Sequence, residues 1–302
     1  MTAASATRSW SAGAASAGSA ARLGGSLAFP ASVVVLIIIM VPILMMFRYS
    51  FNAYDPIEIM KEGFTLDNYR KFFGDAYYRN IFLTTLKVAL LCTVLALLMG
   101  FPVAYFLART QTRFKSLLII LLVFPLLVGN VVRAAGWMVV LGNAGAVNAL
   151  LRYLGVIDEP IKLLYTPLAV VIGTTAVVLP FMILTLQSVL EGIDFSLEEA
   201  ARNLGASQAT MFFRVIVPLA APGVAAGTLL VFILCMNAYA TPVLLGGTGI
   251  TMMAPSLYAQ ITKASNWPFG SAMALVLVCA TLAIAVGSSW LIHRRYVKTM
   301  TT

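Results

Sequence analysis

Charge is scarce in this 302-residue chain, and acidic charge is scarcest: 11 Asp and Glu stand against 20 Lys and Arg, and charged residues are only 10% of the total. Hydrophobic residues make up 61% of the chain, and its mean hydropathy is +0.94. Soluble domains of this length do not have such a composition. We therefore predict a membrane protein with several spanning segments.

Residue types that carry enzyme chemistry are also nearly absent. A single histidine, His293, leaves no serine–histidine–acid set, and no glycine-rich loop ends in Gly-Lys-Ser/Thr to bind a phosphate. The three cysteines, Cys92, Cys235 and Cys279, fall in apolar stretches and show no metal-ligand spacing. We expect this chain to have no enzyme activity, no metal and no cofactor of its own.

Six stretches reach the roughly 20 apolar residues that a helix needs to cross the hydrocarbon core. Each is apolar on all sides rather than alternating, which indicates helices and not barrel strands. We predict an all-α integral membrane protein with six transmembrane helices, at residues 28–47, 80–106, 116–141, 163–187, 215–243 and 269–292.

Basic residues near the span ends indicate the orientation. The short loop 107–115 contains Arg109, Arg113 and Lys115 and no acid, so we place it in the cytoplasm, with both termini on the same side. The predicted topology is N-in and C-in. The net charge of +9 then mainly reflects topology, and we expect contacts with membrane lipid and none with nucleic acid.

This topology divides the chain into four segments. Residues 1–26 are rich in Ala, Ser and Gly and are predicted to form a disordered cytoplasmic N-terminus, with a cleaved signal peptide as the alternative. Residues 27–79 hold the first span and a periplasmic segment, residues 80–292 hold the other five spans, and residues 293–302 form a cytoplasmic tail. A short outer helix is expected at 146–154.

A polar island at residues 191–218, between two of the apolar stretches, is the most informative part of the chain. Its first half predicts a short amphipathic helix. Ser196 caps the helix and Glu199, three residues later, completes a capping box. Glu198 and Arg202 have the i, i+4 spacing of an ion pair.

Apolar side chains, two of them small, form one face of this helix. They have the spacing i, i+3, i+4 and i+7: Leu197, Ala200, Ala201 and Leu204. Gly205 then supplies a left-handed stop, and Ser207 caps a second helix. A helix of two turns is not stable alone. The island either docks on another protein or covers the end of the bundle as an ordinary loop.

The order Glu199-Ala200-Ala201, then Gly205, then Val215-Ile216-Val217-Pro218 resembles the signature loop of the inner-membrane permeases of binding-protein-dependent ABC importers, which have the type I fold. Valines in place of the usual Ile and Leu before the proline are a small departure. Four other phrases are similar to the spermidine/putrescine branch, in particular its first permease subunit: Thr65 to Tyr69, Leu154 to Val170, Val177 to Met182 and Trp267 to Ala272.

The resemblance implies a function and a set of partners. In that family residues 80–292 correspond to the permease domain, and the loop 191–218 contains the coupling helix, which fits a cleft on a cytoplasmic ATPase. Glu199, Ala200, Ala201 and Gly205 would transmit motion from it, and Pro218 would let the next span bend. The implied partners are an ATPase dimer that binds ATP and Mg, a second homologous permease in a heterodimer, and a periplasmic solute-binding protein at the bacterial inner membrane.

The implied substrate is a small solute, a polyamine or a related amine, with opines, amino acid derivatives and anions as alternatives. Polar or aromatic residues in the spans are the candidates for the translocation path: Arg133, Trp137, Asn237 and Tyr239. Helix–helix packing is the alternative for each of them. On one straight helix, the residues from Lys115 to Arg133 would rise about 26 Å, which places Arg133 near the outer boundary.

Arg133 could sit in a gate, contact the binding protein, or reach the outer surface. An arginine in the path suits an anionic solute better than a polyamine. Two other classes of protein remain open. An ion-coupled secondary carrier would need buried ionisable groups, and none of the acids lies in a predicted span. A membrane scaffold without transport activity is the third hypothesis.

Overall fold

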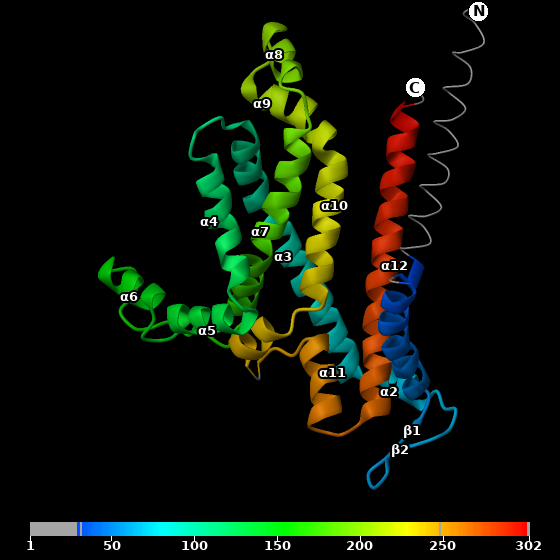
Figure 1. Ribbon diagram of the computed structural model, residues 1–302. Coiled ribbons are helices and arrows are strands. Elements are labelled where there is room, and N and C mark those ends of the chain that lie inside the picture. The colour runs from blue at the N-terminus through cyan, green and yellow to red at the C-terminus, as the bar shows by residue number, and fades with distance from the viewer. Residues whose placement is uncertain (1–28, 31, 248, 301–302) are drawn as a thin grey trace, which may run out of the picture.

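The chain folds into an elongated helical bundle with two distinct ends (Figure 1). The structure is a computed structural model that describes residues 29–30, 32–247 and 249–300. Within these residues the chain is helical apart from one short hairpin and the connecting loops. The segment predicted to be disordered, residues 1–26, lies outside the described residues.

Three long helices form the centre of the bundle: α3 (Ala76–Arg109), α7 (Pro167–Glu191) and α10 (Val217–Met236). The most extensive contact is between α3 and α7, and α10 packs against both of them. α12 (Trp267–Met300) packs against α10. Small side chains let these helices approach closely in a lipid environment, where apolar burial does not drive association. On α3, four of them are completely buried: Ala89, Cys92, Ala96 and Ala104.

Two glycines mark the closest approaches to α7. A Cβ added to Gly223 of α10 would lie 2.6 Å from the Val189 side chain, and one added to Gly173 of α7 would lie 2.3 Å from Leu245 Cδ1. Real Cβ atoms do not come so close to other atoms. These glycines are therefore needed for packing, and α10 runs through Gly223 as one helix.

The two ends of the bundle carry different short elements. At the end where α8 (Ser196–Asn203) lies, α9 (Gln208–Met211) and a π-helical segment η1 (Phe212–Ile216) lead into α10. The other end carries several further short elements, among them β1 (Ala53–Asp55), β2 (Ile59–Lys61), α2 (Asp67–Gly74), η2 (Pro242–Gly246) and α11 (Met253–Thr262). The antiparallel hairpin β1–β2, with Tyr54 opposite Met60, was not predicted from the sequence.

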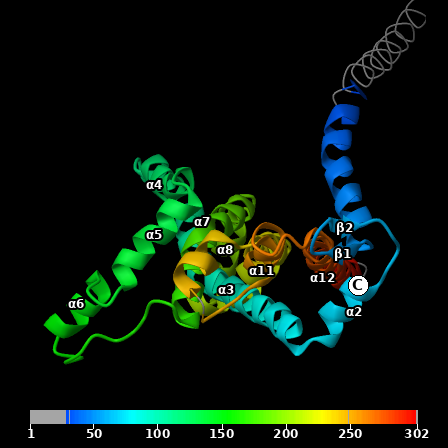
Figure 2. The same ribbon diagram turned by 90° about the horizontal axis from the view of Figure 1, so that it is seen from below.

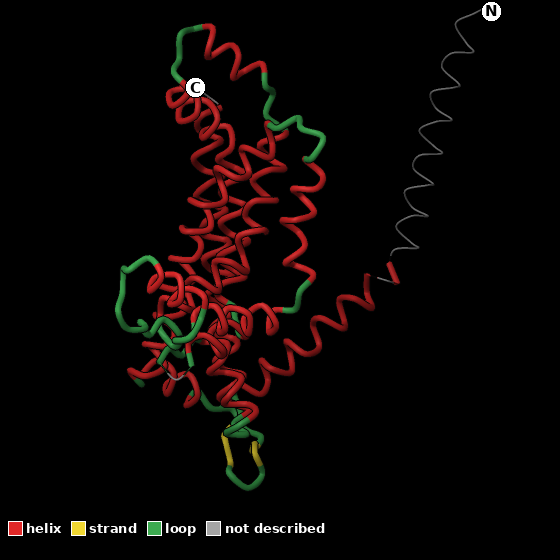
Figure 3. Tube along the Cα trace, turned by 90° about the vertical axis from the view of Figure 1, so that its left-hand side faces the viewer, coloured by secondary structure: helices red, strands yellow, loops and turns green. Residues whose placement is uncertain are grey.

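The first apolar helix, Ser32–Ser50, leans away from the bundle (Figures 2 and 3). None of its most apolar 18-residue window is buried within the chain. An apolar helix that the rest of the protein does not bury suits a lipid environment. At the other end of the sequence, α12 continues as a helix to Met300 and takes in most of the segment predicted as a cytoplasmic tail, 293–302.

Length and hydropathy mark six segments of the described chain as able to cross a membrane, the number predicted. Five of them match the predicted spans: Ser32–Ser50, Ala76–Arg109, Pro167–Glu191, Gln208–Met236 and Trp267–Trp290. The sixth, Asn130–Tyr153, does not coincide with the predicted third span at 116–141.

The prediction of one straight third helix is wrong. The chain forms α4 (Lys115–Leu127), then α5 (Asn130–Leu141), then α6 (Ala146–Tyr153). α4 runs along the bundle, whereas α5 and α6 lie across its end (Figure 1). Pro125 and Gly129 stand at the break between α4 and α5, and both residue types disfavour a continuous helix. α6 confirms the short helix expected at 146–154.

Candidate functional site

The polar island forms a compact helical loop at one end of the bundle. α8 ends as predicted: Gly205 has a φ of +82°, and the Ala206 N–H donates to the Ala201 carbonyl at 3.0 Å. This left-handed residue turns the chain sharply into α9. Ser207 caps α9 as predicted, because its hydroxyl oxygen accepts from the Thr210 N–H at 3.2 Å.

The start of α8 differs from the predicted capping box. Ser196 lies inside the helix and caps nothing, and Glu199 does not reach back to it. Asp194 takes over this role, since its Oδ1 accepts from the Ser196 N–H at 2.9 Å. This hydrogen bond from the Ser196 backbone and a second one from the Ser196 side chain favour the ionised carboxylate. They lower the pKa of Asp194 below its usual value of 3.8.

Glu198 makes tertiary contacts in place of the predicted pair with Arg202. Its Oε1 accepts from Arg109 Nε at 2.6 Å and its Oε2 from the Tyr105 hydroxyl at 2.8 Å. Arg109 Nη1 also donates to the Ile193 carbonyl at 3.0 Å. The Glu198 side chain is only 1% exposed. α8 is therefore held against the end of α3 by a buried, hydrogen-bonded ion pair.

The opposite face of α8 is largely exposed. Ala200 and Glu199 are exposed, Leu197 is 44% exposed and Leu204 is 89% exposed. A leucine with nine-tenths of its surface exposed on a loop tip has no role in this chain's own packing. Of the other residues predicted for this site, Ala201 is half-buried, whereas Gly205 and Pro218 are exposed.

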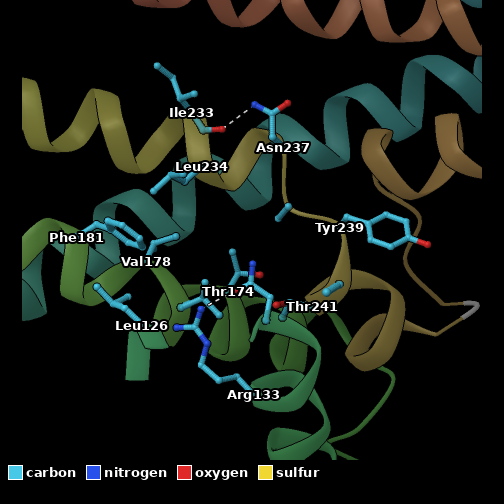
Figure 4. Close-up of a pocket in the computed structure, with 14 residues that line it drawn as sticks. Leu126, Arg133, Thr174, Val178, Phe181, Ile233, Leu234, Asn237, Tyr239 and Thr241 are labelled. Atoms are coloured by element: carbon cyan, nitrogen blue, oxygen red, sulfur yellow. Dashed lines mark hydrogen bonds between the residues drawn. The ribbon is translucent and has the colours of Figure 1, made fainter. Parts of the chain in front are cut away.

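A cavity of about 520 Å³ lies between α4, α5, α7 and the end of α10 (Figure 4). Three of the four predicted path residues line it: Arg133, Asn237 and Tyr239. The fourth, Trp137, is half-buried on α5 and packs against the hydrophobic core instead. The residues after α10, from Asn237 to Thr241, leave the helix and form one wall.

Arg133 does not lie on a straight helix that points to the outer surface. It is at the end of the bundle away from α8, and its side chain reaches into the cavity towards Thr174. Its Nη2 donates to Asn130 Oδ1, whereas Nε and Nη1 are buried and have no acceptor among the described residues. The Thr174 hydroxyl is likewise buried and unpaired there.

The cavity is cationic. Of the described residues that line it, none is acidic, and Arg133 is the charged one. Asn237 uses its side-chain N–H on the Ile233 carbonyl at 2.9 Å, and the Tyr239 ring lies 4.9 Å from that of Tyr258. The cavity thus offers unpaired donors on the Arg133 side and an aromatic side chain, Phe181, on α7, whereas the Tyr239 ring points away from Arg133 (Figure 4).

Sequence reasoning missed several residues of both sites. Arg109 was interpreted as a marker of topology, and neither Tyr105 nor Thr174 was singled out. Phe101, Tyr105 and Arg109 have the i, i+4, i+8 spacing of one helix face, which is the signal that could have drawn attention to this part of α3.

The fold and these two sites define a class of protein: a multi-pass membrane protein with a cavity between its helices and an exposed helical loop at the opposite end. Residues 93–295 match the family described as binding-protein-dependent transport system inner membrane component, and the chain belongs to this family. It is therefore an inner-membrane transport subunit and not an enzyme. An ATPase and a binding protein are the partners of this class of permease.

Two curated relatives carry the same description, spermidine/putrescine transport system permease protein PotB. The proteins from Salmonella typhimurium and Escherichia coli (strain K12) are each 37% identical over 260 residues, which is 86% of this chain and 88% and 92% of theirs. The molybdenum transport system permease protein ModB of Mycobacterium bovis is 29% identical over 68% of this chain and 77% of its own length.

A solved structure confirms the fold. A chain from the crystal structure of a bacterial alginate ABC transporter, in complex with an alginate pentasaccharide-bound periplasmic protein, superposes with a TM-score of 0.72. The match covers 88% of this chain and 93% of that one, at 15% sequence identity. The predicted ABC importer permease fold is thus confirmed.

Proposed function

We propose that this chain forms half of the translocation path of an ATP-driven importer, with α8 as the helix that docks on the ATPase. The exposed apolar face of α8 carries this proposal. Leu204 is 89% exposed although its helix is anchored from behind by the buried Glu198. A helix fixed on one side with an apolar, small-residue face on the other is suited to a groove in a partner protein.

The proposal assigns roles to the residues of the loop. Glu199, Ala200, Ala201 and Gly205 contact the ATPase, and Pro218 lies where the loop joins α10. Closure of the ATPase dimer around ATP and Mg displaces α8, and the spanning helices move between inward-open and outward-open arrangements. The loop side of the bundle is then cytoplasmic, with N-in and C-in topology. The cavity end faces the periplasm and receives solute from the binding protein.

The second half of the path comes from a homologous permease in a heterodimer. The helix Ser32–Ser50 supports a partner in the membrane, because it leans away from this chain's own bundle. Residues 80–292 form the permease domain of this half. A lone ion-coupled carrier is disfavoured, because the described lining of the cavity offers no carboxylate to bind a coupling cation.

The substrate follows most directly from the relatives, whose descriptions name spermidine and putrescine. An aromatic face such as that of Phe181, which lines the cavity, can hold an amine by cation–π contacts. A second candidate is a solute that carries a carboxylate or another oxyanion. The buried, unpaired N–H groups of Arg133 favour it, because such donors are costly to leave without an acceptor.

Reconstituted vesicles test the function. The chain, a second permease and the ATPase are placed in the membrane with the binding protein outside, and ATP is supplied on the ATPase side. We expect uptake that requires all four components. Uptake by this chain alone, driven by an ion gradient, would show that it is a secondary carrier.

The same vesicles distinguish the two substrate classes. Labelled spermidine is compared with labelled dicarboxylates and amino acid derivatives, in the wild type and in Arg133→Gln. Loss of Arg133 removes a repulsive charge for a polyamine and a binding group for an anion. Polyamine uptake that is kept or raised supports the first candidate, and anion uptake that is lost supports the second.

A further inference from the structure

The end of α3 touches the polar island at two separate places. Arg109 and Tyr105 hold Glu198 of α8. The second place is the ring of Phe212 in η1. The Tyr105 ring also contacts it, with the ring centroids 5.6 Å apart, and so does the Phe101 ring, one turn earlier on α3, at 5.4 Å; both contacts are edge-to-face. These three α3 residues form a single ridge, because they are spaced i, i+4, i+8.

We propose that this ridge, Phe101, Tyr105 and Arg109, is the receiver of the loop's motion, and that the Glu198–Arg109 ion pair is a stiff joint between α8 and α3. The inference rests on the function proposed above. α3 is 34 residues long and makes the largest helix contact of the bundle, with α7. A displacement of α8 that reaches α3 therefore reaches the walls of the cavity through α7.

Burial separates the joint from the docking surface. Glu198 is 1% exposed, so it does not touch a partner, whereas its neighbour Glu199 is exposed. Arg109 is 15% exposed and has three contacts within the chain: the Glu198 carboxylate, the Ile193 carbonyl and the Phe195 ring, 5.9 Å from its guanidinium carbon. Such an enclosed ion pair holds α8 in a fixed position on α3, because separating the two side chains would leave both charges unpaired in a desolvated place.

The three other ion pairs among the described residues are more open to solvent. Lys61 of the Lys61–Asp55 pair is 58% exposed. Lys115 and Glu191, 2.8 Å apart, are 30% and 41% exposed and lie on α4 and α7. Asp67 and Arg70, 3.6 Å apart, are 76% and 80% exposed on α2, at the far end of the molecule. This last pair provides a matched control, because Asp67→Asn makes the same carboxylate-to-amide change at an exposed site.

The test uses the complete transporter in vesicles, with uptake, ATP hydrolysis and the amount of assembled ATPase measured on one preparation. For Glu198→Gln we expect normal ATPase assembly, with solute imported per ATP lowered about tenfold, within the range of mutations along coupled networks. Arg109→Gln should give the same loss, and the double variant no more than either single one, because both act through one contact. Asp67→Asn should leave the ratio unchanged.

A more conservative variant keeps the test valid if Glu198→Gln or Arg109→Gln misfolds. Tyr105→Phe removes only the hydroxyl bond to Glu198 and keeps the aromatic contact with Phe212, and we expect the ratio to fall about two- to threefold. A merely structural role would lower hydrolysis, uptake and assembly together and leave the ratio constant, which would overturn the proposal. Normal ratios in both Glu198→Gln and Tyr105→Phe would also overturn it. If the wild type itself shows no ATP-dependent uptake, the proposed function fails instead.

Discussion

Gly205 offers the sharpest separation between a structural and a docking role for the loop. Its φ of +82° lies in the left-handed region, and an added Cβ would meet no atom within 4 Å. A side chain at this position therefore costs backbone strain of about 1–2 kcal/mol and creates no clash within the chain. That strain is small for a bundle of this size, so variants should fold and insert.

The two roles predict opposite orders for three variants of Gly205. Left-handed strain is greatest for alanine and smaller for asparagine and aspartate, whose short polar side chains tolerate this conformation. If strain alone matters, Gly205→Ala transports worst. If the surface docks on the ATPase, the larger and charged side chains do more harm, and we expect Gly205→Ala to transport best, then Gly205→Asn, then Gly205→Asp.

The magnitude follows from placing a charge in a closed interface, which costs about 2–5 kcal/mol. Uptake by Gly205→Asp should therefore fall by at least about thirtyfold, at about 1.4 kcal/mol for each factor of ten, and less ATPase should co-purify. Expression, the size-exclusion profile and the melting temperature check the fold. Near-normal uptake by Gly205→Asp, or alanine as the worst of the three, would refute the docking role.

Two further predictions concern packing and the start of α8. Gly223→Ala should lower the melting temperature, because overpacking against Val189 costs about 1–3 kcal/mol of stability. Gly287→Ala is the control and should leave the melting temperature unchanged, because an added Cβ meets nothing within 4 Å there. Equal melting temperatures of the two variants would contradict the close approach of α7 and α10. Asp194→Ala should reduce uptake and Asp194→Asn should largely keep it, because the amide oxygen can still accept from Ser196. Since the folded pKa of Asp194 is lowered, its contribution is fully present at neutral pH and is lost only as the pH falls below 3.8, so a loss of α8 helicity near pH 6 would contradict this assignment.

The large features of the fold could be predicted because they follow from composition. Runs of apolar residues identify spanning segments without reference to tertiary contacts. Gly205 and Ser207 were also predictable, since a left-handed stop and an N-cap are local properties of the chain. The family motif then connected the loop with a partner.

Features that depend on tertiary contacts could not be predicted in the same way. The stretch 116–141 is apolar on all sides, so its periodicity cannot show that the chain turns after Leu127. Glu198 had a local candidate partner in Arg202, whereas its actual partner is Arg109, 89 residues away in sequence. At the start of α8, the sequence predicted Ser196 as the cap, whereas Asp194 accepts the hydrogen bond from the Ser196 N–H.

The residues that line the cavity could also be predicted only in part. Arg133, Asn237 and Tyr239 were selected because they are polar or aromatic within apolar sequence, and the fold brings them together around one space. Trp137 met the same criterion and packs elsewhere, since a tryptophan in a spanning helix suits the core as well as a path. Thr174 is a short polar residue that sequence patterns do not distinguish from an ordinary packing residue.

One measurement tests the central claim most directly, namely that the exposed face of α8 lies in the cytoplasm against the ATPase. Leu204, at 89% exposed, is replaced by cysteine in a chain whose exposed Cys279 is serine, and the assembled transporter is treated with a short thiol-reactive cross-linker. The account predicts a cross-link from position 204 to the ATPase and no labelling of intact cells by a membrane-impermeant maleimide. Labelling from outside the cell, or a cross-link to the binding protein alone, would contradict it.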